Sequence, residues 1–305
     1  MTKNFDLGQH IHRSAVNVMD FGAKGDGVAD DTAAFLLAFA SGQPVYAPAG
    51  TYLVDALSIP TGFGFSFTGA GRRRTILQAR AANQKVLRAA GAVAAFAHIG
   101  GFSIKAHAAG STGPAFDCSG FRDCFMFEID GLSNGSAGFN ALFDVAAAPY
   151  LTYGVVWEKC GLQEQTGFAH VWRFHNNGTG AGGNANGCEI RAPWIYANTG
   201  LTFAIDAARS ALLKVMGGVI EQNPSATAIR WGSTMRIDGV WFEVNNKHLE
   251  PGMLADGVGN GSFVTNCVFS DAKTIDFFGN PNGVAANVWI NNTEFGLQKI
   301  GRAHV

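Results

Sequence analysis

The chain has 305 residues, of which 47% are hydrophobic and 15% are charged, and its formal net charge is −1. This hydrophobic content excludes a disordered chain, and the near-neutral charge gives no general electrostatic reason to bind nucleic acid or an anionic membrane. The 40 glycines and 24 phenylalanines predict many short strands, tight turns and stacked apolar side chains. All-β architectures of this size often form a single domain.

Residues 1–16 lack the apolar core of a secretory signal peptide, and no segment of the chain runs to 18 consecutive apolar residues. We therefore expect neither a signal peptide nor insertion into a membrane. We expect residues 1–16 to form a short arm, residues 17–98 to open and cap the fold, and residues 99–305 to form its body.

The most informative stretch of the chain runs from Asn17 to Leu57. Val18–Phe21 is predicted to be a short strand, and Gly22–Val28, with three glycines, a turn that needs permissive backbone angles. A helix is predicted over Ala33–Ala40. Pro44–Val54 is then predicted to form a strand, a turn and a second strand.

The order of these elements resembles the amino-terminal segment of the pectate-lyase-like superfamily. Its members are right-handed parallel β-helix proteins, and they include phage tailspikes and many polysaccharide-degrading enzymes. The resemblance implies an all-β fold, a single-stranded right-handed parallel β-helix with an N-terminal capping helix. Such a cap is physically sensible, because an open end would expose unpaired strand edges. For a tailspike, the resemblance also implies a homotrimer.

Three acids, Asp26, Asp30 and Asp31, form the only dense acidic group of the sequence. They precede the predicted helix, where side-chain capping and negative charge are both favourable. Helix capping explains them better than a calcium site, which gathers several acidic oxygen ligands. We therefore expect no metal and no cofactor.

The cysteines and the basic residues are expected to be structural. The five cysteines are widely spaced without a CxxC pair, which favours buried free thiols in a reducing cytoplasm over zinc ligands or disulfides. The run Arg72-Arg73-Arg74 lies in a glycine-rich turn and is the only basic cluster. We interpret it as a solvated or salt-bridged loop rather than a nucleic-acid contact.

From residue 99 onward a seven-residue pattern recurs, with an apolar first position and an apolar or aromatic sixth. Its last four intervals, of 25, 22, 27 and 26 residues, fit one coil of a parallel solenoid each. Alternation, β-branched residues and glycines disfavour helical repeats, and the leucine spacing of leucine-rich repeats is absent. The pattern begins at Ile99, Thr152, Ile190, Val215, Ile237, Val264 and Ile290.

Two longer intervals need explanation. The 53 residues between Ile99 and Thr152 fit two coils, and the 38 residues from Thr152 to Ile190 imply an insertion between Cys160 and Gly187. Stacked asparagines are also expected in one turn of the solenoid, at Asn266, Asn291 and Asn292.

The outer face of the solenoid is where chemistry is expected. If the first, third and sixth pattern positions point inward, alternation places the fifth and seventh on the outer face. Glu221 and Glu243 are then one coil, about 4.8 Å, apart. We predict Glu221, Glu243 and Glu158 as catalytic residues. The outward pairs are Val156/Glu158, Trp194/Tyr196, Val219/Glu221 and Trp241/Glu243.

This combination of side chains suits a carbohydrate. The aromatic rings of Trp194, Tyr196 and Trp241 are predicted to stack on the apolar faces of sugars, while the carboxylates bind hydroxyls. Two carboxyl groups about 5–5.5 Å apart serve a retaining glycosidase, and about 6.5–9.5 Å an inverting one. Their mutual repulsion would raise one pKa and keep that acid protonated near neutral pH. The alternative is that the glutamates are solvated surface charges and the tryptophans fill a subunit contact.

The expected insertion supplies a second candidate region. We predict that His170, Trp172 and Arg173 bind substrate from a loop beside the acidic face. If His170–Phe174 is a strand, His170 and Trp172 share one face and Arg173 lies on the other. His175 is a further candidate, although a lone histidine is more often structural.

Three functions follow from the sequence. The first is a phage or prophage tailspike, made in the host cytoplasm and carried on the virion tail, that binds and cleaves a bacterial surface polysaccharide. Its arm, residues 1–16, would dock into another tail or baseplate protein, and three chains would form a homotrimer. The second is a non-enzymatic structural or receptor-binding tail protein. The third is a cellular polysaccharide lyase, hydrolase or epimerase, which the missing signal peptide disfavours.

Overall fold

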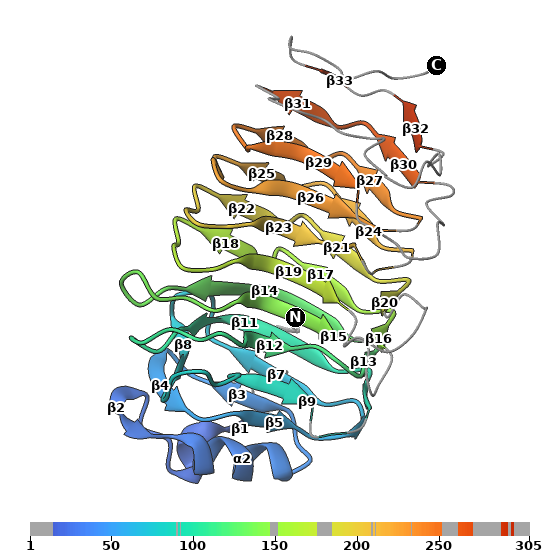
Figure 1. Ribbon diagram of the computed structural model, residues 1–305. Helices are drawn as coiled ribbons and strands as arrows, with labels where there is room; N and C mark the ends of the chain where they lie inside the picture. Colours follow the sequence, from blue (N-terminus) through green and yellow to red (C-terminus); the bar gives the residue numbers. More distant parts are fainter. Residues whose placement is uncertain are drawn as a thin grey trace, which may run out of the picture.

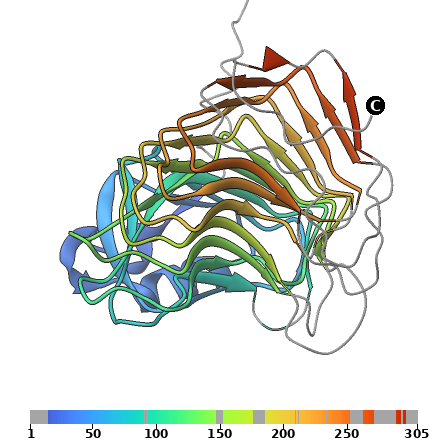
Figure 2. The same cartoon turned by 45° about the horizontal axis from the view of Figure 1, so that its top comes forward.

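The computed structural model describes residues 15–89, 91, 93–146, 152–175, 185–208, 210, 212–232, 234–251, 262–270, 288–291 and 294–295. Within these residues the chain winds into a stack of short coils, from the N-terminal coils at the bottom of Figure 1 to the later coils at its top. Figure 2 shows the strands of successive coils lying over one another. All pairings between the named strands are parallel, so the predicted parallel solenoid is confirmed.

Three sheets run along the stack, of 20, 8 and 5 strands in the described part of the chain. The 20-stranded sheet contains β1 (Val16–Asn17), β2 (Asp26–Asp30), β3 (Val45–Ala47), β4 (Gly50–Val54), β7 (Ser66–Gly69), β8 (Thr75–Ala79), β11 (His98–Lys105), β14 (Phe125–Leu132), β17 (Val156–Glu158), β18 (Gly161–Gln163), β21 (Glu189–Arg191), β22 (Trp194–Tyr196), β24 (Lys214–Met216), β25 (Val219–Glu221), β27 (Arg236–Asp238), β28 (Trp241–Glu243), β30 (Ser262–Thr265), β31 (Val268–Ser270), β32 (Val288–Asn291) and β33 (Glu294–Phe295).

The other two sheets close the coil. The eight-stranded sheet contains β5 (Leu57–Ile59), β9 (Leu87–Ala89), β12 (Pro114–Asp117), β15 (Ala141–Ala146), β19 (His170–His175), β23 (Phe203–Asp206), β26 (Thr227–Trp231) and β29 (Lys247–Pro251). The five-stranded sheet contains β6 (Gly62–Phe63), β10 (Ala94–Ala95), β13 (Phe121–Arg122), β16 (Thr152–Tyr153) and β20 (Ala185–Asn186).

In its later coils the 20-stranded sheet has two parallel rows of strands. Row 1 is β17, β21, β24, β27 and β30, and row 2 is β18, β22, β25, β28 and β31. The first pattern positions stand in register along row 1 from Ile190 through Val215, Ile237 and Val264 to Ile290. The four predicted coil lengths are therefore confirmed.

A left-handed residue bends the chain between the two rows. It is the third pattern position, with φ of 47° at Ala192, 63° at Gly217 and 68° at Gly239. The expectation that this position points inward is wrong, because the bend resets the alternation. The fourth position, as at Val240, is buried instead.

The pattern start assigned to Thr152 is also wrong. Thr152 belongs to β16 of the five-stranded sheet, and it is Trp157 that stands in register with Ile190. The row continues upstream through Met126 on β14 and Ile99 on β11 to β7, β3 and β1, so five strands of the described chain precede Trp157 in it. The apparent insertion is accordingly shorter than the sequence interval suggested.

A buried asparagine ladder follows row 2, but in other residues than predicted. Asn198 Nδ2 donates to Asn223 Oδ1 (3.1 Å), and Asn223 Nδ2 donates to Asn245 Oδ1 (3.0 Å). Asn266 is instead exposed and donates to Asp238 (2.8 Å). The side chain of Asn291 and all of Asn292 lie outside the described residues. The predicted kind of ladder therefore exists, but at the bend that follows row 2 and not at the bend between rows 1 and 2.

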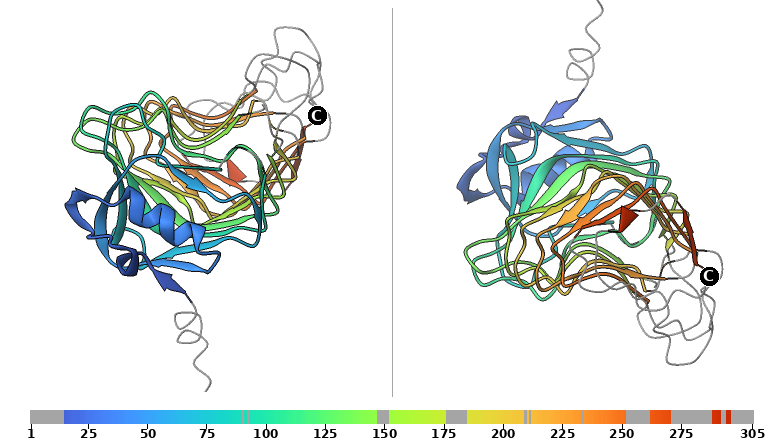
Figure 3. Two further views of the ribbon diagram at one scale, coloured as in Figure 1. Left: turned by 90° about the horizontal axis from the view of Figure 1, so that it is seen from below. Right: turned by 90° about the horizontal axis from the view of Figure 1, so that it is seen from above.

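The N-terminal segment differs in detail from its prediction. Val18–Phe21 is a 3-10 helix (η1) rather than a strand, because the Asn17 side chain accepts a hydrogen bond from the Met19 N–H. Asp26–Asp30 is the strand β2, where a turn was expected up to Val28. The predicted helix is present as α2 (Thr32–Ala40), and it lies across the lower end of the stack in Figure 3.

The three acids before α2 bind backbone N–H groups, but not as expected. Asp31 occupies the N-cap position without a capping hydrogen bond, and its carboxylate accepts from Lys24 N (2.6 Å) and Gly25 N (3.2 Å). Asp30 accepts from Thr32 N (3.0 Å). The capping role is therefore wrong for Asp31, whose side chain fastens the preceding glycine turn.

Whether α2 serves as the cap of the solenoid stays a prediction, and Phe35 tests it. Phe35 is fully buried and lies edge-on to Tyr52 (5.2 Å) and Phe67 (5.9 Å). We expect Phe35→Ala to lower the free energy of unfolding by about 3–5 kcal/mol, measured by urea denaturation. Leu37→Ala, on the exposed side of the same helix, should change it by less than about 0.5 kcal/mol. Equal effects of the two variants would contradict the capping role.

The five cysteines are buried and free, as predicted. Around them the core is a continuous stack of apolar side chains between the sheets, from Val18 near the lower end to Phe269 in the later coils. This rigid stack fixes the register of the outward side chains on row 2.

Candidate functional site

Six outward side chains of row 2 form what we call the aromatic–acidic strip. One column runs through Trp194, Val219 and Trp241, which are direct partners on neighbouring strands. The adjacent column runs through Tyr196, Glu221 and Glu243. The residues between the columns, Ile195, Ile220 and Phe242, point into the core. The predicted outward placement of these three pairs is confirmed.

The two indoles of the strip are open to solvent. Trp194 is 51% exposed and Trp241 is 43% exposed, whereas most large aromatic side chains of the described coils are buried. Val219, a small residue, separates them by two strand spacings, about 10 Å. Trp241 Nε1 donates to Glu243 Oε2 (3.0 Å), so one carboxylate of the strip is oriented by its aromatic neighbour. The strip can thus present flat apolar faces beside fixed carboxylate oxygens.

Glu221 and Glu243 face each other across neighbouring strands. Partial burial, together with repulsion from the Glu243 carboxylate, raises the pKa of the Glu221 carboxyl above its usual value. A raised carboxyl pKa suits a group that donates a proton near neutral pH. The expected raised pKa of one acid of the pair is therefore present at Glu221.

This coupling predicts a pH-dependent stability. A carboxyl whose pKa is raised on folding stabilises the protein below the usual pKa of 4.5, and this contribution is lost as the pH rises through the raised value. Glu221→Gln should therefore gain stability relative to the wild type as the pH rises from about 4 to 8, by up to about 1 kcal/mol. Thermal melts of both proteins across this range measure the difference. A difference that does not vary with pH would show that folding does not raise the pKa of the Glu221 carboxyl.

Glu158 does not belong to the strip, and its predicted alignment with Glu221 is wrong. It lies on β17 in row 1, in register with Arg191 of the next coil. The column continues to Met216 and Asp238. Both rows carry the same outward–inward–outward triplets, so Val156-Trp157-Glu158 resembles Val219-Ile220-Glu221 although the two stand on different rows. Any catalytic role of Glu158 would be separate from the strip.

His170, Trp172 and Arg173 are also placed away from the strip. The predicted strand exists as β19, but it belongs to the eight-stranded sheet. Trp172 is fully buried and stacks on Phe143 (5.3 Å), so its prediction as a substrate contact is wrong.

The polar residues of β19 have protein partners. Arg173 donates to Asp144 (2.6 Å), and the His175 imidazole lies 2.9 Å from the same carboxylate. His170 stacks on Phe203 (5.9 Å), and burial lowers the pKa of its imidazole to about 4. These contacts hold the eight-stranded sheet together, and a binding role for His170 or Arg173 stays a prediction.

Sequence reasoning missed a polar cluster on the column of Trp194. Asp130 precedes Gly161 and Trp194 in that column, and it is nearly buried. It accepts hydrogen bonds from Ser103 and Arg73. The arginine run was visible in the sequence, but its proximity to Asp130, 57 residues later, depends on the register of the coils.

Neither a metal centre nor a membrane-spanning helix appears in the described coils. Within them no group of three or more His, Cys, Asp or Glu residues is arranged to hold a metal ion. The helices of the described part are too short to cross a bilayer.

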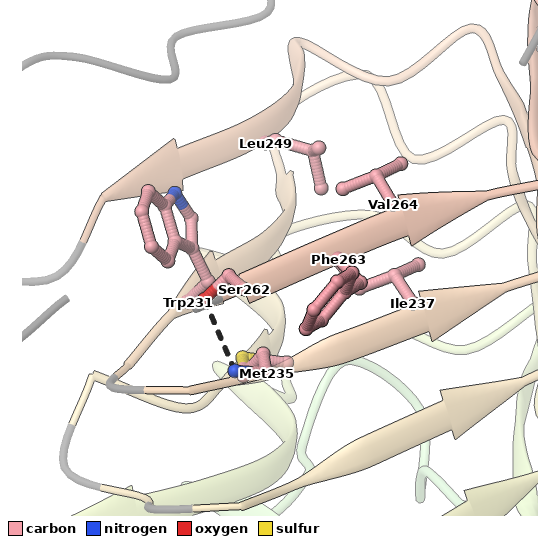
Figure 4. A pocket seen from close by; sticks show the side chains of 7 residues that line it. All are labelled: Trp231, Met235, Ile237, Leu249, Ser262, Phe263 and Val264. Atoms are coloured by element: carbon pink, nitrogen blue, oxygen red, sulfur yellow. Dashed lines mark hydrogen bonds between the residues drawn. The ribbon is translucent and has the colours of Figure 1, made fainter. Parts of the chain in front are cut away.

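An apolar pocket lies elsewhere, between the 20-stranded and eight-stranded sheets of the later coils. Figure 4 shows its side chains, with the Met235 N–H donating to Ser262 Oγ (3.1 Å). It contains no titratable side chain, so its lining offers no acid or base. The lining residues are Trp231, Met235, Ile237, Leu249, Ser262, Phe263 and Val264.

Two phage proteins are similar in sequence to a short part of this chain. The preneck appendage protein of Bacillus phage PZA and the pre-neck appendage protein of Bacillus phage phi29 are each 45% identical over 69 residues, which are 22% of this chain. The matched segment is 8% of the length of each relative.

Solved structures of phage proteins share the fold. ORF18 of Geobacillus virus E2 has a TM-score of 0.60 at 16% identity, covering 97% of this chain and 64% of that one. The tailspike protein of Acinetobacter baumannii phage AM24 has a TM-score of 0.58 at 13% identity, covering 93% of this chain and 54% of that one. The N-terminal fragment of the phi29 gene product 12 has a TM-score of 0.53 at 18% identity, covering 92% and 52%.

A family model adds a more specific match. It is described as rhamnogalacturonase A/epimerase, pectate lyase-like, and it matches residues 15–107. This range contains Asn17–Leu57, the segment that resembles the pectate-lyase-like superfamily. Residues 15–107 thus carry the pectate-lyase-like family signature, within a parallel β-helix protein similar to phage appendage and tailspike proteins.

Proposed function

We propose that this protein is a phage or prophage tail appendage of the tailspike type, which binds a bacterial surface polysaccharide along the aromatic–acidic strip. The observation that carries the proposal is the register that brings Trp194, Trp241, Glu221 and Glu243 onto one outer face. Exposed indoles beside carboxylates are the groups that bind sugar rings and their hydroxyls. The named phage relatives support a place on the virion tail.

We further propose that Glu221 and Glu243 cleave the bound polysaccharide. Glu221, with its raised pKa, would protonate the leaving oxygen, and Glu243 would act as the ionised partner. Their backbones lie one strand spacing, about 4.8 Å, apart, which favours the short carboxyl separation of a retaining hydrolase over the longer one of an inverting enzyme. The Trp241 hydrogen bond fixes the direction of the Glu243 carboxylate.

The test is to spot the purified protein on lawns of encapsulated bacteria and to assay the extracted polysaccharides for new reducing ends. Haloes together with reducing-end release are the expected result. Products with a new double bond would point to β-elimination instead of hydrolysis. Neither binding nor degradation of any polysaccharide across a broad strain collection would overturn the proposal.

A non-enzymatic receptor-binding or structural tail protein is the second candidate. One observation favours it, namely that the Glu243 carboxylate is already engaged by the Trp241 indole and so suits recognition without turnover. Binding of a polysaccharide without release of reducing ends, even after long incubation at several pH values, would select this function.

The assembly is a further part of the proposal. We propose a homotrimer of right-handed β-helices that attaches to another tail or baseplate protein through residues 1–16, of which 1–14 lie outside the described part of the chain. Right-handed winding is the usual outcome for parallel strands joined by crossovers. Light scattering of the purified protein should give three times the chain mass of 32.1 kDa. A monomer would contradict the trimer.

A further inference from the structure

The arginine run begins with a turn that holds Arg73 in a strained conformation. Arg73 has a φ of 60°, in the left-handed region that side chains other than glycine rarely adopt. Its backbone N–H donates to Ser103 Oγ (2.7 Å), and the Arg74 N–H donates to the Gly71 carbonyl (3.1 Å). Left-handed residues occur at other bends of the coils, and here the conformation, with the two backbone hydrogen bonds, fixes the direction in which the Arg73 side chain leaves the turn.

The Arg73 guanidinium is aimed by two acceptors. Arg73 Nε donates to Asp130 Oδ2 (3.4 Å), and Nη2 donates to the Gln163 carbonyl (3.4 Å). Asp130 is 5% exposed and is itself held by the Ser103 hydroxyl. The Arg73 side chain remains 48% exposed. Of its five N–H donors, the described contacts use two, which leaves the Nη1 and Nη2 edge for another acceptor.

This guanidinium stands at the end of the aromatic–acidic strip. Asp130, Gly161 and Trp194 are successive partners in one column, and Gln163 is the partner of Tyr196 in the other. Gly161 contributes no side chain between Asp130 and the exposed indole. A Cβ there would lie 2.0 Å from the Trp194 carbonyl oxygen, so glycine is required by the close approach of the two strands.

We propose that Arg73 binds the carboxylate of an acidic sugar residue whose ring stacks on Trp194, so that the strip recognises an acidic polysaccharide. Planar guanidinium groups bind carboxylates through two parallel hydrogen bonds, and the free Nη edge of Arg73 has this geometry. The glycan would then run from Arg73 past Trp194 to Trp241 and Glu243. This inference rests on the proposed polysaccharide-binding function and adds the chemical class of the glycan.

The test uses a panel of oligosaccharides that contain glucuronate, galacturonate or N-acetylneuraminate, each with its carboxyl-reduced counterpart, together with neutral oligosaccharides. Binding is measured by isothermal titration calorimetry. At least one acidic probe should bind, and its carboxyl-reduced form should bind at least 10-fold more weakly. Arg73→Gln should weaken binding of the acidic probe by about 10- to 100-fold and leave binding of the carboxyl-reduced probe nearly unchanged.

Controls separate this site from loss of fold and from loss of general charge. Arg74→Gln removes the same charge from the same turn and should change binding by less than about twofold, because screened surface charges act weakly. Arg73→Lys keeps the charge but not the planar fork, and should recover only part of the affinity. Thermal melting of each variant verifies that the coils remain folded. Trp194→Ala should weaken binding of the acidic and of the carboxyl-reduced probes to the same extent.

The outcomes distinguish this inference from the function on which it rests. If a neutral oligosaccharide binds and Trp241→Ala abolishes its binding while Arg73→Gln does not, the strip is a glycan site and Arg73 is only a structural ion pair. Equal binding of an acidic probe and its reduced form would likewise overturn the inference alone. If no oligosaccharide of either kind binds, the proposed function fails together with the inference.

Discussion

Replacing Glu221 or Glu243 by glutamine is expected to lower the rate of polysaccharide cleavage by about 10²–10⁴-fold, the usual contribution of a positioned acid or base. Glutamine keeps the size of the side chain and loses its proton chemistry. Binding of the intact polysaccharide should change far less, because the Trp194 and Trp241 indoles remain. Reducing-end assays under single-turnover conditions, with binding measured separately, check both expectations.

The chain offers a matched comparison in Glu158→Gln. Glu158 ends an outward–inward–outward triplet like those of Glu221 and Glu243, but it lies on row 1 beside Arg191. This variant should change the cleavage rate by less than about twofold, since it is not part of the strip. The effects of replacing two groups that act as a unit are not additive. The cleavage rate of the double variant of Glu221 and Glu243 should therefore be no more than about 10⁴-fold below that of the wild type. Full activity in both single variants would remove these carboxylates from the mechanism.

The periodicity of the sequence predicts the later coils well and the earlier coils poorly. From Ile190 to Val264, each coil has an inward apolar residue, a bend and an outward pair, so the register follows from spacing alone. Upstream of Ile190, the connection between strands varies in length. Thr152 and Trp157 both fit the first position of the seven-residue pattern, with Trp157 and Leu162 as the respective sixth positions. The sequence does not reveal which of the two stands on row 1.

The candidate site divides in the same way. The pairing of Glu221 with Glu243 is a single step between adjacent coils, so a regular period is enough to predict it. The contact of Arg73 with Asp130 depends on a left-handed turn and on the register of two long strands, neither of which leaves a repeating signal. Trp172 shows a further limit, since Val171 and Trp172 are both fully buried, so strict alternation does not predict which side chains of this strand enter the core.

The middle residue of the asparagine ladder should be among the most sensitive positions of the fold. Asn223 is fully buried, and its Nδ2 donates to Asn245 Oδ1 (3.0 Å) and to the Glu221 carbonyl (2.8 Å). Its Oδ1 accepts from the backbone N–H and the side chain of Asn198, both at 3.1 Å. We expect Asn223→Ala to lower the free energy of unfolding by about 3–5 kcal/mol, because several buried polar groups lose their partners at once. Urea denaturation followed by circular dichroism measures this loss.

Asn246 is an exposed asparagine next to the ladder residue Asn245. As the matched control, Asn246→Ala should lower the free energy of unfolding by less than about 0.5 kcal/mol. The ladder also bears on the candidate site, since Asn223 holds the carbonyl of Glu221 at the bend that ends strand β25. If the ladder positions the strip, a variant that remains folded in the cold, such as Asn223→Ser, should cleave polysaccharide more slowly than the wild type at the same temperature. Unchanged cleavage in that variant would show that the apolar core alone fixes the register of Glu221 against Glu243.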